Sequence, residues 1–283
     1  MTFDEAKHQF IASLQTQSKA TATVVAYRKD IEQLIEYLSS DGKSTILEVT
    51  DVHLNAFVEK LSGQNLTPKT VSRKINSLKT FYRFLVSAGH VPHNHAASVA
   101  HPKFETKAPR VLSKMEYRAL RDACREDPRI AAVVELLLQT GMRIGELAAL
   151  TLESISPDFI KIPAIEGHPE RDVPLNRPAK TAIDRYLEVR PKVKTNALFV
   201  TKTGKPLLVR NMRTAIDRYF RIAGIRDAKV NDLRHTFIVH HLAGGASPLI
   251  VSKLVGHKRI STTERYIIIA KEVVTEKVKL EEL

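Results

Sequence analysis

Residues 131–150 read AAVVELLLQTGMRIGELAAL, and the first half of this stretch decides how the chain folds. Its run of alanine, valine and leucine is too continuous for a surface helix and is typical of a helix buried in a core. Gly141 directly follows the run, and glycine is the residue that most often ends a helix. The stretch therefore predicts a largely buried helix that stops at Gly141, with Arg143 just beyond its end.

The sequence around this helix predicts a mainly helical domain. Upstream, Ser113 is a good N-cap for a helix from Lys114 to about Glu126. Downstream, FIKIPAI (159–165) and RDVPL (171–175) have the composition of β-strands, and EGHPE (166–170) between them predicts a hairpin with its turn near Gly167 and His168. We therefore expect residues 113–283 to form a mixed α/β domain, mostly helical, with one small antiparallel sheet at its edge.

The N-terminal part, residues 1–98, has a helical pattern into which four helices fit. One of them carries Ile31, Leu34, Ile35 and Leu38 at the spacing of a single buried face. The last begins at the sequence TPKT (67–70), with a threonine cap and a proline at the first helical position, and runs to a stopping glycine at position 89. Its inward stripe is expected to consist of Val71, Ile75, Leu78, Phe81, Tyr82 and Leu85.

The remaining surface of this last helix is basic. We expect it to bind DNA through Lys69, Arg73, Lys74 and Lys79. The alternative is an ordinary solvated face. The composition favours the first interpretation, because 44 lysines and arginines against 31 acidic residues give a formal charge of +13, which attracts polyanions.

Residues 99–112 contain two prolines, several charges and no period, so they are expected to link the two domains. A length of 283 residues also favours two domains over one.

Several other classes of protein are excluded by the composition. The single cysteine, Cys124, allows neither a disulfide framework nor a multi-cysteine zinc site, and we expect it to be a core residue. The N-terminus lacks the apolar run of a secretory signal, and no stretch is long enough for a membrane span. Loop histidines at positions 90, 93 and 95 have no carboxylate or thiol beside them, so no metal site is expected. The protein is thus expected to be soluble and cytoplasmic.

Residues suited to phosphate chemistry occur in three separate segments. Arg143 and Arg234 can each hold a phosphate through charge-assisted hydrogen bonds and stabilise the extra negative charge of a five-coordinate transition state. Tyr266 is a reasonable nucleophile for such a phosphate, because a covalent intermediate keeps the energy of the broken bond for religation. This chemistry requires neither a metal nor a nucleotide cofactor.

In order along the chain, these segments read TGMRIGEL (140–147), DLRHTF (232–237) and LVGH (254–257), with Tyr266 nine residues after His257. The combination resembles the signature of the tyrosine site-specific recombinases, the Xer and phage integrase family, and the resemblance covers essentially the whole chain. It implies a four-helix, SAM-like core-binding domain followed by the catalytic domain, which together clamp duplex DNA. It also implies cleavage through a 3′-phosphotyrosine and a Holliday junction, with no cofactor.

The resemblance further implies a role for each matching residue. Arg143 and Arg234 would hold the scissile phosphate, His257 would donate a hydrogen bond beside them and Tyr266 would attack the phosphorus. Glu146 is similar to an acidic residue that orients its neighbours in the family's active site.

Two positions depart from the family's pattern. Asn231 stands where a histidine is usual, and an amide cannot shuttle protons. Glu166 stands where a general-acid lysine is expected, and a carboxylate there would repel a phosphate. Either another lysine is used, with Lys161, Lys202 and Lys205 as candidates, or catalysis is impaired or dependent on a partner. His235, next to Arg234, is expected to be structural, as are His240 and His241.

The tail, about 267–283, has a helical pattern with an apolar side that must be buried. The resemblance implies that this helix is exchanged between protomers in a tetramer on two DNA sites, and the alternative is packing within its own chain. The sequence of the tail is compatible both with a homotetramer and with an assembly of two different recombinases. The compact layout favours the Xer type, which resolves chromosome or plasmid dimers. The principal alternative is a DNA-binding protein of recombinase fold that is catalytically impaired or activated by a partner.

Overall fold

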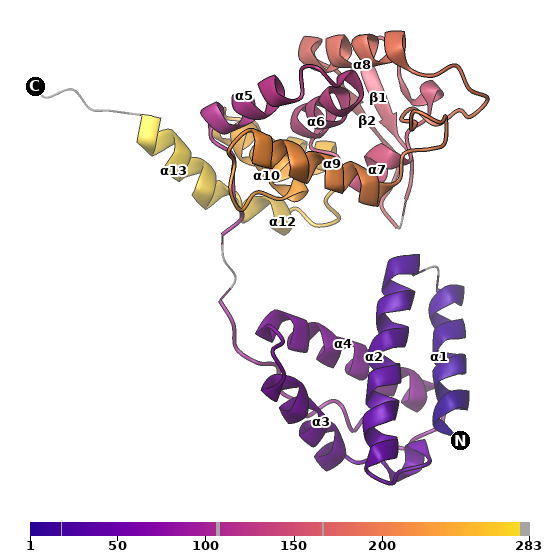
Figure 1. The fold of residues 1–283 in the computed structure, drawn as a ribbon. Coiled ribbons are helices and arrows are strands. Elements are labelled where there is room, and N and C mark those ends of the chain that lie inside the picture. Colours follow the sequence, from indigo (N-terminus) through magenta and orange to yellow (C-terminus); the bar gives the residue numbers. More distant parts are fainter. Residues whose placement is uncertain (18, 106–107, 166, 278–283) are drawn as a thin grey trace, which may run out of the picture. The chain divides into compact units, whose positions relative to one another are not determined.

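The structure is a computed structural model and describes residues 1–17, 19–105, 108–165 and 167–277. The chain divides into two compact units, Met1–Lys107 and Ala108–Leu283, and each has a hydrophobic core of its own. Both units are mainly helical, and the second contains one small sheet (Figure 1), which confirms the predicted fold class. Within the described residues, no helix has both the length and the apolar character needed to cross a membrane.

The N-terminal unit consists of four α-helices and one short 3-10 helix within its described residues, as the helical pattern predicts. The helices pack their apolar stripes against one another in a single core. In chain order the elements are α1 (Phe3–Thr16), α2 (Thr21–Ser40), η1 (Ile46–Glu48), α3 (Asp51–Gly63) and α4 (Pro68–Ser87).

Helix α4 has the ends and the inward face that its sequence predicts. The hydroxyl of Thr67 accepts a hydrogen bond from the backbone N–H of Thr70, and Pro68 occupies the first turn. The helix ends at Ser87, and Gly89 follows it in the left-handed region with φ of 74°. The whole predicted stripe is buried, namely Val71, Ile75, Leu78, Phe81, Tyr82 and Leu85.

The basic side of α4 differs from the predicted one because a buried carboxylate on α2 draws two of its cations inward. Arg73 donates to both oxygens of Asp30 (2.5 and 2.9 Å), and Lys74 donates to Asp30 (3.0 Å) and Gln33 (2.7 Å). Burial opposes the ionisation of Asp30, but hydrogen bonds from Arg73, Ser77 and Lys74 outweigh it and hold its pKa below the usual range. Lys74 therefore lies largely along α2 instead of in solvent, while Arg73 stays half-exposed.

The C-terminal unit places most of its helices around the buried helix predicted at 131–140. Within its described residues the elements are α5 (Lys114–Ala123), α6 (Pro128–Thr140), α7 (Ile144–Ala148), η2 (Leu152–Ser154), β1 (Phe159–Ile162), β2 (Arg171–Pro174), α8 (Arg177–Val189), α9 (Val209–Ile222), α10 (Val230–Ala243), α11 (Pro248–Val255), α12 (Ser261–Glu264) and α13 (Ile267–Lys277).

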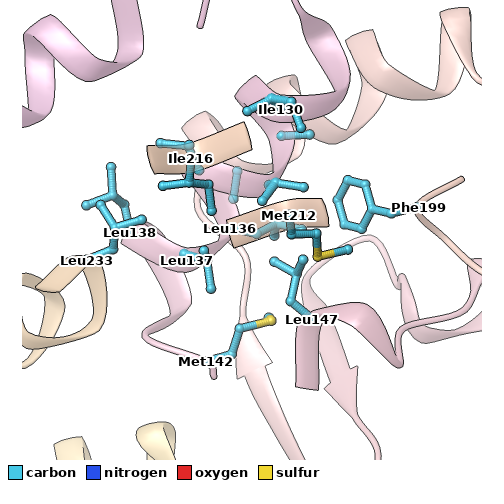
Figure 2. Packing of buried hydrophobic residues seen from close by; sticks show 14 of the residues in the cluster. Ile130, Leu136, Leu137, Leu138, Met142, Leu147, Phe199, Met212, Ile216 and Leu233 are labelled. Atoms are coloured by element: carbon cyan, nitrogen blue, oxygen red, sulfur yellow. The ribbon is translucent and has the colours of Figure 1, made fainter. Parts of the chain in front are cut away.

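Helix α6 is the centre of this core, as its apolar sequence predicts. Figure 2 shows Ile130 and the leucines of α6 meeting Met212 and Ile216 from α9. Cys124 is buried and free beside them, as expected. The helix ends at Gly141, whose φ of 61° is left-handed, and a side chain at this position would collide with the ring of Phe237 on α10. Gly141 therefore both ends α6 and lets α10 approach it.

The predicted hairpin is present. Strands β1 and β2 pair antiparallel, with Phe159 opposite Pro174 and Ile162 opposite Arg171. The pairing continues toward the turn, where the backbones of Ile165 and His168 exchange two hydrogen bonds. This register aims the turn and the start of β2 toward α11, which β2 contacts.

The tail helix α13 packs against α10 of its own chain over the part whose side chains are described. Ala270, Ile269 and Val273 join a cluster that includes Ile238 and Val251. Figure 1 shows α13, in yellow, directly after α12. Residues 278–283 of the expected exchange segment lie outside the described residues.

The two ends of the expected linker 99–112 belong to the two cores. Val99 is buried in the N-terminal core, and Leu112 is buried in the C-terminal one, where its N–H donates to Thr236 (2.9 Å).

Candidate active site

Glu146 lies at the centre of the site and binds Arg143. Arg143 is the cap residue of α7; its backbone N–H and its Nη1 donate to the two carboxylate oxygens of Glu146 (2.8 and 2.9 Å). Nη2 of Arg143 also donates to the carbonyl of Gly256 (3.2 Å). The spacing of three residues in TGMRIGEL thus produces a capping contact, which fixes the guanidinium at the start of a short helix.

A second arginine, Arg171 on β2, binds the same carboxylate. Its Nη1 and Nη2 donate to the two oxygens of Glu146 (3.0 and 2.8 Å), and its Nε donates to the carbonyl of Leu254 (2.7 Å). A side chain at Gly256 would come within 2.7 Å of this guanidinium, so the glycine of LVGH leaves room for it. Glu146 is only 1% exposed. Burial raises its pKa, but the bonds from Arg171 and Arg143 dominate and lower it to about 2.

Arg234, on α10, completes a group of three arginines. Its side chain is 5% exposed, and Nη1 donates to the carbonyl of Gly141 (2.6 Å). Its Nη2 is buried with no hydrogen-bond partner among the described residues. Burial, followed by the charges of Arg143 and Arg171, lowers the pKa of Arg234 to about 9, so the group is still charged at neutral pH.

We call Arg143, Arg171 and Arg234 the arginine cluster. It has more positive charge than its surroundings neutralise, because one carboxylate faces three guanidiniums. A buried charged donor without a partner costs free energy, and a bound anion would supply the missing acceptor. The cluster is therefore prepared for an anion with several oxygens, such as a phosphate diester.

His257 and Tyr266 lie side by side next to this cluster. Nδ1 of His257 is 2.7 Å from the hydroxyl of buried Thr263. Burial and the charge of Arg234 lower the pKa of His257 to about 4, so its ring is neutral at pH 7. The rings of His257 and Tyr266 are nearly parallel, at 19°, with centroids 6.5 Å apart.

Tyr266 is 9% exposed and lies within the field of Arg234. Burial raises the pKa of its phenol, and the charge of Arg234 partly offsets that rise. His235, predicted to be structural, also reaches this tyrosine, with ring centroids 5.8 Å apart. Its Nδ1 is 3.3 Å from Asp232 on the preceding turn. Asn231, in contrast, is exposed in the first turn of α10.

The hairpin turn borders the site, and Lys258 lies next to it. A side chain on Gly167 would be 3.2 Å from Nζ of Lys258, and His168 interacts electrostatically with Arg143 and Glu146. Glu166, the residue at the expected lysine position, lies outside the described residues.

The three candidate lysines are not brought to the arginine cluster within the part of the chain that the structure describes. Lys161 pairs with Glu170 (3.0 Å) on the exposed side of the hairpin. Lys202 and Lys205 are exposed in a loop whose Gly204 packs against Val193.

Sequence reasoning missed Arg171 and His168 as site residues. Arg171 served only as a marker of the RDVPL strand, although a charged residue at the start of a half-buried strand was a usable signal. His168 was expected only to mark the turn.

Among the described residues, no cluster of histidine, cysteine and carboxylate side chains has the composition of a metal site.

The expected DNA-binding residues belong to the other unit. Lys69 is exposed, Lys79 is half-buried, and Arg73 and Lys74 bind Asp30 as described above.

Two family models match the chain. The phage integrase family model matches residues 110–272, and the model of the phage integrase N-terminal SAM-like domain matches residues 8–89. Together they span most of both units.

Relatives with similar sequences are tyrosine recombinases. Tyrosine recombinase XerD of Rickettsia bellii is 30% identical, with 86% of this chain and 87% of that protein aligned. Tyrosine recombinase XerC of Staphylococcus haemolyticus is 31% identical, over 93% of this chain and 92% of that protein.

A solved structure of a lambda integrase tetramer bound to a Holliday junction has the same fold. It matches with a TM-score of 0.75 at 17% identity and covers 92% of this chain and 79% of that one. The family match and the relatives agree with the motifs that the structure brings together around Glu146. The chain therefore belongs to the phage integrase family and is a tyrosine recombinase.

Proposed function

We propose that Tyr266 cuts DNA by attacking a phosphate held by Arg143 and Arg234. The observation that carries this proposal is the unpartnered, buried Nη2 of Arg234, which lies in an arginine cluster beside the tyrosine. A phosphate diester bound there accepts from Nη2 and offsets part of the surplus positive charge. In the five-coordinate transition state the phosphate gains negative charge, so the same arginines bind it more strongly than the ground state.

The proposed step conserves the energy of the phosphodiester bond. The Tyr266 oxygen forms a bond to phosphorus as its proton passes to solvent, and the bond from phosphorus to the 5′-oxygen breaks. That oxygen takes up a proton, so the products are a 3′-phosphotyrosine and a 5′-hydroxyl. A 5′-hydroxyl from a second duplex then attacks the phosphotyrosine and releases the tyrosine. One such exchange makes a Holliday junction, and a second exchange resolves it. Neither exchange consumes an external energy source.

The other site residues have supporting roles in this proposal. If the hydroxyl of Thr263 donates to Nδ1 of His257, the ring proton is on Nε2, which is then a donor for a phosphate oxygen. Glu146 positions Arg143 through two hydrogen bonds. Asn231 can donate a hydrogen bond from the first turn of α10 but transfers no proton.

We propose that the enzyme acts in the Xer manner, resolving dimers of chromosomes or plasmids in the cytoplasm. The support is its similarity, at 30–31% identity over 86–93% of the chain, to proteins named XerD and XerC. Residues 1–98, with Lys69, Arg73, Lys74 and Lys79, are proposed to contact the DNA backbone, and residues 99–112 to join them to the catalytic domain.

The working assembly is proposed to be a tetramer on two DNA sites, held together by the C-terminal helix. The solved lambda integrase tetramer supports the stoichiometry. Because Tyr266 immediately precedes α13, the position of this helix affects the position of the tyrosine. An exchanged helix therefore offers a way to link assembly to cleavage.

Incubation of the protein with a nicked suicide duplex that carries its recombination site tests the proposed cleavage. The nick lets a short strand diffuse away, so the covalent intermediate accumulates. We expect a slowly migrating protein–DNA band on a denaturing gel, and we expect Tyr266→Phe to abolish it. DNA binding without an adduct would instead support the second candidate, a DNA-binding protein of recombinase fold that is catalytically impaired or needs a partner. The carboxylate at Glu166 and the amide at Asn231 are what favour that candidate.

A further inference from the structure

His168, in the turn between β1 and β2, has an unusual environment. Its Nδ1 is buried and has no hydrogen-bond partner among the described residues. Its own backbone is hydrogen-bonded to Ile165: the N–H of His168 donates to the carbonyl of Ile165 (2.9 Å), and its carbonyl accepts from the Ile165 N–H (3.1 Å). An imidazole whose buried nitrogen has no partner has no evident structural purpose.

The charged groups that face this imidazole are those of the active site. They come from three parts of the chain: Arg143 and Glu146 at the start of α7, Arg171 on β2, and Lys258 and His257 in the segment after α11. Gly167, the neighbour of His168, lies against Lys258, so the turn contacts this segment directly. His168 is therefore part of the same site as the arginine cluster, although no recombinase motif in the sequence includes it.

The proposed reaction needs a proton for the departing oxygen, and apart from His168 and the amine of Lys258 the described groups of the site are poorly suited to supply it. Cleavage expels a 5′-oxygen, and an alkoxide leaves readily only if it is protonated as the bond breaks. Arginines keep their protons, and Asn231 has none to transfer. His257 has Nδ1 within hydrogen-bond distance of Thr263, and in the scheme above its Nε2 binds a phosphate oxygen. His235 has Nδ1 3.3 Å from the carboxylate of Asp232, although it makes no hydrogen bond there. At the position where the family's lysine is expected the sequence has Glu166, a carboxyl group in place of an amine.

We propose that His168 donates the proton to the departing 5′-oxygen. The proposal rests on the cleavage by Tyr266 proposed above. As the bond between phosphorus and the 5′-oxygen breaks, the proton moves from the imidazolium of His168 to that oxygen and leaves a neutral ring and a 5′-hydroxyl. In the reverse direction His168 accepts the proton of the attacking 5′-hydroxyl. No oxidant, metal or further reactant takes part.

Bound DNA should favour protonation of the His168 imidazole. Without DNA, burial and then the charge of Arg143 lower the pKa of His168 and keep it neutral. A phosphate diester in the arginine cluster adds a negative charge that offsets those arginines and raises the pKa. The imidazole therefore takes up its proton when the scissile phosphate is in place.

The test is a duplex in which sulfur replaces the departing 5′-oxygen. A thiolate leaves without being protonated, so a proton donor becomes dispensable on this substrate while the arginines remain necessary. We expect His168→Gln to cleave the ordinary duplex about 10² to 10⁴ times more slowly than the wild type, the usual effect of losing a general acid. On the sulfur duplex its rate should return to near that of the wild type. His168→Asn is a second variant, since asparagine suits turns.

Three controls make the result specific. Arg234→Ala should be slow on both duplexes, because it loses transition-state binding and not proton transfer. Lys258→Met tests the neighbouring amine as the alternative proton donor: if His168 supplies the proton, the sulfur duplex should not restore the rate of this variant. His240→Gln, an exposed histidine on α10, should behave as the wild type.

Four results would overturn the assignment: a His168→Gln variant that cleaves the ordinary duplex normally, one that is slow on both duplexes, one that no longer binds DNA, or sulfur rescue of Lys258→Met instead. If the wild type forms no Tyr266 adduct on either duplex, the proposed cleavage itself fails. If the wild type cleaves both and His168→Gln matches it, only the role of His168 fails.

Discussion

Arg171 donates two hydrogen bonds, of 3.0 and 2.8 Å, to the two carboxylate oxygens of Glu146, and the two residues are 25 positions apart in the sequence. The same carboxylate also binds Arg143, so Glu146 connects the hairpin to the start of α7. Its single negative charge holds two guanidiniums in fixed positions and leaves the site with surplus positive charge. Both the stability of the domain and the orientation of Arg143 depend on this pair.

Replacement of Arg171 by lysine keeps the charge but removes the planar pair of donors. Lysine cannot make both bonds to Glu146 and also reach the carbonyl of Leu254. We expect Arg171→Lys to lower the free energy of unfolding by roughly 1.5–3 kcal/mol, the usual range for hydrogen bonds to a charged group, and to slow adduct formation. Urea denaturation and the suicide-duplex assay measure the two effects. Arg177→Lys, at an exposed site, should change neither, and equal effects of both substitutions would contradict this role for Arg171.

The stability of the protein should fall at low pH partly because of Glu146. Its pKa of about 2 in the folded state lies below the ordinary value of 4.5, so the unfolded chain binds the proton more readily. The ionised carboxylate of Glu146 stabilises the folded state fully above about pH 4.5, and this stabilisation is lost as the pH falls toward 2. This lowering of the Glu146 pKa corresponds to a contribution of roughly 3 kcal/mol to the free energy of unfolding at neutral pH.

Glu146→Gln provides the measurement for this pH dependence. The variant should be less stable than the wild type at pH 7, and the difference in unfolding free energy should narrow as the pH falls from 5 to 3. A difference that stays constant over this range would show that the charge of Glu146 is not what stabilises the domain.

Gly141 is expected to tolerate no side chain. It has a φ of 61°, which costs a non-glycine residue about 1–2 kcal/mol, and a methyl group there would collide with the ring of Phe237. We expect Gly141→Ala to lower the free energy of unfolding by more than about 2 kcal/mol. Gly224 is the matched control, because its φ of 70° is similar but nothing lies within 4 Å of a side chain there. If Gly141→Ala and Gly224→Ala lower the free energy of unfolding equally, the contact with Phe237 is unimportant.

The parts of this structure that sequence predicted are those set by local pattern. The ends of α4, the buried α6 and the hairpin follow from caps, apolar runs and turn residues within a few positions of one another. The three short motifs also come together as their resemblance to the recombinases implies. The sequence contains no comparable local signal for contacts between elements that are distant along the chain. Arg171 meets Glu146, and Arg73 meets Asp30, only because the packing of separate elements brings them together.

The cations on the basic side of α4 should differ in their roles: one should contribute to DNA binding alone, and the other should also stabilise the fold. Lys69 is exposed, so Lys69→Ala should weaken DNA binding without affecting stability. If it contacts one phosphate, the slope of log affinity against log salt should decrease in magnitude by about 0.9. Arg73→Ala should also destabilise the fold, since it leaves the buried Asp30 with fewer donors. Filter binding at several salt concentrations and thermal unfolding distinguish these outcomes. An unchanged salt slope for Lys69→Ala would exclude this lysine as a phosphate contact.

The two sides of α13 should respond differently to a charge. Ala270 is 4% exposed and packs in the cluster with Ile238 and Val251, so Ala270→Asp buries an unpaired charge and should destabilise the folded protein by several kcal/mol. Ile268 is 68% exposed, and Ile268→Asp should leave the free energy of unfolding within about 0.5 kcal/mol. If α13 also contacts a neighbouring protomer, Ile268→Asp should reduce the complex that joins two DNA sites while binding to a single site stays normal. Native gels with one and two sites measure this directly. A normal two-site complex with Ile268→Asp would mean that this side of α13 is not an interface.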